Sequence, residues 1–132
     1  MAVYKSKESK ESEYSTTQAI KELADTTKKA IATAEGYLSA IKQKGQDYRQ
    51  PKLEQELKNL INGLIDQYNT LQADWHQKRT ILENKAKEVI QKGNMEAAKI
   101  YAKVITPLEK NEKQAEQIKN KLSDLRKQLE EL

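Results

Sequence analysis

Residues 115–132 read AEQIKNKLSDLRKQLEEL, and apolar side chains recur along this stretch in alternating steps of three and four. The apolar positions are Ala115, Ile118, Leu122, Leu125, Leu129 and Leu132. Steps that average 3.5 residues line up side chains in one seam of a helix that packs against another helix. We therefore predict a coiled-coil seam formed by Ile118, Leu122, Leu125 and Leu129.

The same spacing continues towards the N-terminus and predicts long helices at about residues 15–45, 51–92 and 94–132. In the first helix the repeat consists of Ile20, Ala24, Thr27, Ile31, Ala34, Leu38 and Ile41. The second helix has a broader apolar face, made of Leu53, Leu57, Leu60, Leu64, Leu71, Trp75, Leu82, Ala86 and Val89 and widened by Ile61, Ile65 and Tyr68. A face of that width is typical of a helix that contacts two neighbours.

Glycine, proline and asparagine mark the breaks between these helices. Gly45 suits the position after a helix end, and Pro51 suits a first helical turn, where its missing N–H costs nothing. Gly93 followed by Asn94 predicts a helix end and then the N-cap of the next helix. Short turns make consecutive helices antiparallel, and a turn centred there places Leu125 level with Asn62.

The fold class that follows is all-α: a long antiparallel coiled-coil hairpin or three-helix bundle with a charged N-terminal tail. We predict the tail in residues 1–14 and a single helical coiled-coil domain in residues 15–132. Charged residues make up 33% of the chain, the hydrophobic set makes up 36%, and phenylalanine is absent. So few large apolar side chains fill a thin seam between helices better than a thick core.

The net charge and the composition of individual segments limit where the protein is expected to be located and what it is expected to bind. The net charge of +4 is spread along the chain, without the concentrated basic stripe of a dedicated nucleic-acid binder. The N-terminus has no apolar core of a signal peptide, and no stretch approaches the roughly 20 apolar residues of a membrane span. We expect a cytoplasmic or virion protein that is neither secreted by a signal peptide nor transmembrane.

No residue pattern points to catalysis. His76 is the only histidine, and metal or catalytic sites built on histidine need further ligands nearby. The glycines stand alone, so there is no phosphate-binding loop. We predict a protein that is not an enzyme, with no catalytic residue, cofactor, metal site or small-molecule substrate. Gly36 and Gly63 fall inside predicted helices, where glycine is unfavourable. They indicate either a close helix crossing or hinge at these positions, or exposed glycines that the helices tolerate.

An uncovered apolar surface is expected around Gly93. In the predicted register the first helix covers only half of the hairpin formed by the other two. Unless residues 1–14 continue as a helix and cover the rest, the open half is a site for a partner. The predicted interaction surface consists of Ile81, Val89, Ile100, Tyr101 and Ile105.

The function that fits these features is a non-enzymatic structural or adaptor protein acting through helix–helix association. We expect a subunit of a larger assembly, such as a virion or a secretion apparatus, with a protein partner or self-association. A membrane surface is a second possible partner. A nucleic-acid-associated protein that uses scattered lysines is a further alternative, which the even charge makes less favoured.

One segment carries a family resemblance. Residues 85–102, and above all IQKGNMEAAKIYA at 90–102, resemble the first helical hairpin of ESCRT-III proteins of the charged multivesicular body type. Residues 125–132 resemble that family's terminal MIT-binding helix. The resemblance implies a membrane-remodelling polymer, although Pro107 falls where the family helix continues. The turn pattern also resembles tetratricopeptide hairpins, because any tight helical turn favours glycine, a capping asparagine and small residues.

Overall fold

A computed structural model describes the backbone of residues 2–132 and the side chains of residues 18–132. Over these residues the chain forms three α-helices, α1 (Ala2–Lys44), α2 (Pro51–Gln91) and α3 (Met95–Glu130), and no β-strand. A short 3-10 helix, η1 (Gln46–Tyr48), lies between α1 and α2. The predicted all-α fold is confirmed. Contacts divide the chain into two compact units, Met1–Leu60 and Ile61–Leu132.

The N-terminal half differs from the expected organisation. Helix α1 begins at Ala2, not at Ser15, so the backbone of the predicted tail is helical. Lysine and glutamate, which are frequent there, are good helix formers, and this favours continuation of the helix. The side chains of that tail lie outside the described residues. The single helical coiled-coil domain over residues 15–132 stays a prediction.

Unit 1 consists of α1, η1 and the first turns of α2. The buried positions along α1 are Leu23, Thr27, Ala30, Ala34, Tyr37 and Ile41. Three of them belong to the predicted repeat, whereas Ala24, Ile31 and Leu38 are only half-buried. At these three positions the buried residue is instead the one that precedes the predicted residue, on the same broad face of the helix. Gly45 follows the last residue of α1 and has a φ of +90°, which favours glycine.

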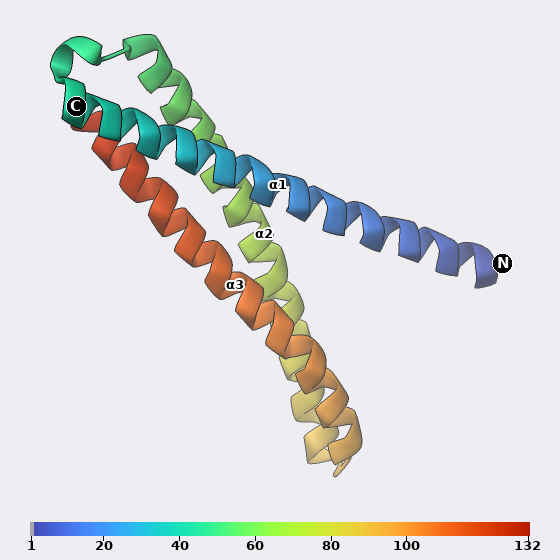
Figure 1. Ribbon diagram of the computed structural model, residues 1–132. Helices are drawn as coiled ribbons and strands as arrows, with labels where there is room; N and C mark the ends of the chain where they lie inside the picture. Colours follow the sequence, from blue (N-terminus) through green and yellow to red (C-terminus); the bar gives the residue numbers. More distant parts are fainter. Residues whose placement is uncertain (1) are drawn as a thin grey trace. The chain divides into compact units, whose positions relative to one another are not determined.

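Unit 2 is an antiparallel hairpin of α2 and α3 (Figure 1). Gly93 has a φ of +78°, and the Asn94 and Gly93 N–H groups donate to the carbonyls of Val89 and Ile90 at 2.8 and 2.9 Å. These two bonds form the Schellman motif that ends α2. The Asn94 side chain accepts a hydrogen bond from the N–H of Ala97 at 3.1 Å and caps α3. The predicted stop and cap at Gly93 and Asn94 are both present.

Hydrogen bonds between side chains of the two helices fix the register of the hairpin. Arg126 donates to the side chain of Asn62 at 2.7 Å, and Lys119 donates to that of Asn69 at 2.7 Å. Both pairs agree with the expected level of Leu125 beside Asn62. Helix α3 continues through Pro107, although the carbonyl of Lys103 loses its usual donor there.

The glycines at positions 36 and 63 are exposed and mark no close helix crossing. A methyl group added to either residue meets no atom within 4 Å. The close-crossing interpretation of these glycines is therefore wrong, because a tight approach of another helix would fill that space.

We expect Gly36→Ala and Gly63→Ala each to raise the free energy of unfolding by about 0.5–1 kcal/mol, since alanine loses less backbone entropy in a helix. Urea unfolding followed by circular dichroism measures the change. Gly93→Ala is the control, and its positive φ should make it destabilising. Destabilisation by Gly63→Ala would mean that the glycine is needed for flexibility.

Candidate interaction surface

Salt bridges and hydrogen bonds join the middle of α2 to α3. Arg79 binds the carboxylate of Glu112 through its Nε atom and binds Glu83 at 2.8 Å. The Gln72 side chain donates to the backbone carbonyl of Glu112 at 3.1 Å and to the carboxylate of Glu116 at 2.8 Å. The hydrogen bond from Arg79 lowers the pKa of Glu112, against the opposing effect of burial. These groups fix the register of the two helices.

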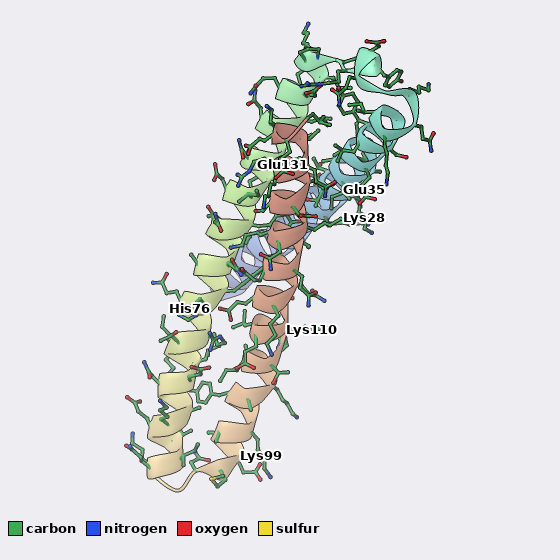
Figure 2. All side chains as sticks on the ribbon, turned by 90° about the vertical axis from the view of Figure 1, so that its left-hand side faces the viewer. Lys28, Glu35, His76, Lys99, Lys110 and Glu131 are labelled. Atoms are coloured by element: carbon green, nitrogen blue, oxygen red, sulfur yellow. The ribbon has the colours of Figure 1, made fainter. Side chains whose placement is uncertain are left out.

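His76 takes part in these polar contacts between α2 and α3. Its Nδ1 atom lies 3.1 Å from the Glu112 carboxylate, and its side chain is largely exposed (Figure 2). Among the described residues, no group of three or more histidine or acidic side chains is placed to hold a metal ion. The absence of enzymatic activity stays a prediction.

A second polar cluster lies in unit 1, at the end of α1. The Tyr37 hydroxyl donates to Glu54, accepts from the backbone N–H of Gln50 at 2.7 Å, and is buried. Arg49 binds the other oxygen of Glu54 at 2.7 Å. Arg49 lowers the pKa of the Glu54 carboxyl, and burial raises the pKa of Tyr37. Each of these polar groups has a partner within the cluster. The cluster therefore stabilises the turn after α1.

Only some of the acids that are followed four residues later by a base form a salt bridge with that base. Asp74 and Lys78 form a salt bridge at 3.0 Å, as the sequence suggests for an acid followed four residues later by a base. Glu54 and Glu83 bind Arg49 and Arg79 instead of the lysines that follow them in the sequence. Arg49 binds both oxygens of Glu54, a two-point contact that the planar arginine guanidinium favours.

The predicted seam residues of α3 are placed as follows. Leu122, Leu125 and Leu129 are buried, and Ile118 is half-buried. On α2 the buried positions are Glu54, Leu57, Ile61, Leu64 and Tyr68. Leu60, which was expected on the same face, is instead 42% exposed. The large buried side chains of α2 thus end at Tyr68, far from the turn at Gly93.

Towards that turn the hairpin leaves apolar side chains in solvent. Of the predicted interaction residues, Ile81 and Ile100 are 48% and 65% exposed, while Val89, Tyr101 and Ile105 are half-buried. Ile90, Met95 and Val104 are also exposed, and they are not among the five predicted interaction residues. The binding role of the five predicted interaction residues stays a prediction. Figure 2 shows this end of the hairpin, where Lys99 is labelled near the turn.

Helix α3 carries two parallel apolar stripes at this end. One stripe is buried or half-buried and consists of Ala98, Tyr101, Ile105 and Leu108. The other precedes each of these positions by one residue, is half-buried to exposed, and consists of Ala97, Ile100, Val104 and Pro107. We call this second set the open stripe. Heptad spacing alone does not separate the two stripes, because Val104 fits it as well as Ile105 does.

The open stripe has an apolar neighbour on α2. In an antiparallel pair of right-handed helices, positions that precede the seam by one residue lie on the same side of the pair. Ile81 precedes Leu82 of the half-buried face of α2, and Ile100 precedes Tyr101 of α3. Ile81 therefore lies on the side of the hairpin that carries the open stripe.

Most charged residues at this end form no salt bridge with another described side chain. Residues 81–105 contain five lysines against three glutamates, of which Glu83 binds Arg79. Among the described side chains, every salt bridge falls outside residues 84–105. The charges around the open stripe thus have no salt-bridge partner among residues 18–132.

Comparison with protein-family models, with curated proteins and with solved structures gave no match. Among the residues that the structure describes, no helix has both the length and the apolar content needed to cross a membrane.

Proposed function

We propose that the chain is a non-enzymatic structural or adaptor protein that works through helix–helix association, as a subunit of a larger assembly. The observation that supports this most strongly is the open stripe. A helix usually buries its apolar face, and α3 carries at this end a second apolar stripe with Ile100 and Val104 in solvent. Another helix packed there would bury it.

The association surface is formed by the open stripe and by Ile81 beside it. Exposed apolar patches on soluble proteins mark sites of interaction more often than isolated exposed residues do. Ile and Val at heptad spacing are also the side chains that fill the seam of a helix pair. The polar groups around Glu54 and Glu112 already have partners within the chain. The open stripe and Ile81 are therefore the surface that we expect to bind another molecule.

The test compares two single substitutions on α3. Ile100→Glu places a charge in the open stripe, whereas Ala102→Glu adds the same charge at an exposed position about 200° around the helix. We expect Ile100→Glu to reduce the native mass of the assembly that contains the tagged full chain in extracts of its source cells. Ala102→Glu should leave that mass unchanged.

Circular dichroism of both purified variants provides the folding control, because both positions are solvent-exposed and should tolerate glutamate. If the Ile100→Glu chain stays in an assembly of unchanged mass, or if the wild-type chain is a monomer in the extract, this function is wrong.

A further inference from the structure

The open stripe has the length and the side chains of a short helix–helix contact. From Ala97 to Pro107 it extends about 15 Å along α3. A small residue stands at one end and a larger one at the other, with Ile100 and Val104 between them. Reversing the direction of such a stripe places Ala97 against Pro107 and Ile100 against Val104. The stripe is therefore complementary to itself in antiparallel orientation.

The charges beside the stripe are complementary in the same orientation. Glu96, Lys103 and Lys110 recur every seven residues along one flank of the stripe, and all three are exposed. In an antiparallel helix pair, like flanks of the two helices face each other. With the stripes fully overlapped, Glu96 of each copy faces Lys110 of the other copy. Lys103 faces its own symmetry mate across the two-fold axis.

We propose that a second copy of this chain occupies the open stripe and forms a two-fold symmetric, antiparallel pair of α3 helices. This inference rests on the proposed function and names the partner of the same surface. A two-fold interface repeats each contact, so the Glu96–Lys110 attraction occurs twice and the Lys103–Lys103 repulsion occurs once. The balance favours pairing, and the small apolar area makes the pair weak, with a dissociation constant on the order of 0.1 mM.

Other occupants fit the stripe less well. An anionic lipid surface is usually contacted by bulky residues such as Trp, Phe and Leu above a basic face. Here the residues of the open stripe are Ala, Ile, Val and Pro, and the adjoining charges have both signs. The mixed charges at positions 96, 103 and 110, one acid and two bases, suit a partner whose charge pattern is equally specific.

Sedimentation velocity of the purified full chain, from about 10 µM to about 1 mM, tests the pairing. We expect the mass to rise with concentration towards that of a dimer, and Ile100→Glu to raise the dissociation constant at least tenfold. Ala102→Glu should change it less than threefold. Monomeric wild-type chain over the whole range would overturn the proposal, including the case in which that monomer binds phosphatidylserine vesicles.

Charge exchange tests the orientation. Glu96→Lys should weaken the dimer by roughly tenfold, and Glu96→Lys combined with Lys110→Glu should restore it. Positions 96 and 110 are about 21 Å apart along one helix, so only contact between copies explains a rescue. Lys103→Gln should strengthen the dimer, because it removes the like-charge contact. A dimer that responds to none of these changes has another arrangement, and the proposal is then wrong.

These outcomes separate the two proposals. If Ile100→Glu disrupts the assembly in cells while the purified chain stays monomeric, the proposed function stands and the second copy is not the partner. If the purified chain pairs as described and Ile100→Glu leaves the cellular assembly intact, the self-pairing stands and the proposed function fails.

Discussion

Leu125→Ala is expected to lower the free energy of unfolding by about 2–5 kcal/mol. The Leu125 side chain is 2% exposed and lies on the same face of α3 as the buried Leu122 and Leu129. Alanine there removes buried apolar surface and leaves a cavity that rigid neighbouring helices close only in part. Urea unfolding of the full chain, followed at the helical circular dichroism band, measures the difference.

The matched control is Leu60→Ala, which removes the same atoms from a leucine that is 42% exposed. Both substitutions replace leucine by a better helix former, so intrinsic propensity cancels from the comparison. We expect Leu60→Ala to cost no more than about 1 kcal/mol. Equal costs at the two positions would contradict the burial of Leu125 in a packed seam.

Residue spacing predicts most of the backbone because helix periodicity and turn chemistry are local. The Schellman end at Gly93 and the cap at Asn94 each depend on residues a few positions apart, and the structure has both. Clean heptads are equally local, which is why the buried Leu122, Leu125 and Leu129 stand out in the sequence. The start of α1 at Ala2 has no comparable mark, since no residue there forces a stop.

The choice between neighbouring positions on a broad face is not local. Both Leu23 and Ala24 suit a seam in α1, but only Leu23 is buried. Similarly, both Val104 and Ile105 suit a seam in α3, and Val104 is exposed. The partner helix decides which of the two stripes is covered. The candidate surface around the turn at Gly93 stays a prediction, and spacing alone does not decide which of its single positions are exposed.

Polar burial was the least predictable feature. Glu54 is buried although a carboxylate at that spacing usually marks a solvated helix face. Its partners Arg49 and Tyr37 lie five and seventeen residues earlier in the chain, so their meeting depends on how the turn after α1 folds. Nothing in the spacing of the sequence announces such a contact.

This cluster makes unit 1 sensitive to acid, and Glu54→Gln is expected to show it. At pH 7 the substitution should cost about 1–3 kcal/mol, because the charge-assisted bonds from Arg49 and Tyr37 weaken. The pKa of Glu54 in the folded chain lies below its ordinary value of about 4.3. A lowered pKa means that ionised Glu54 stabilises the fold above that ordinary value and that this stabilisation is lost as the pH falls through the folded pKa.

The difference in unfolding free energy between wild type and Glu54→Gln should therefore stay constant from pH 7 to about pH 5 and shrink at lower pH. Urea unfolding at a series of pH values measures it. Glu56→Gln is the matched control, because Glu56 is exposed two residues along α2 and should differ from wild type by less than about 0.5 kcal/mol throughout. A Glu54→Gln deficit that persists undiminished at pH 3 would show that the amide disturbs packing and that the ionised carboxylate is not what holds Tyr37 and Arg49.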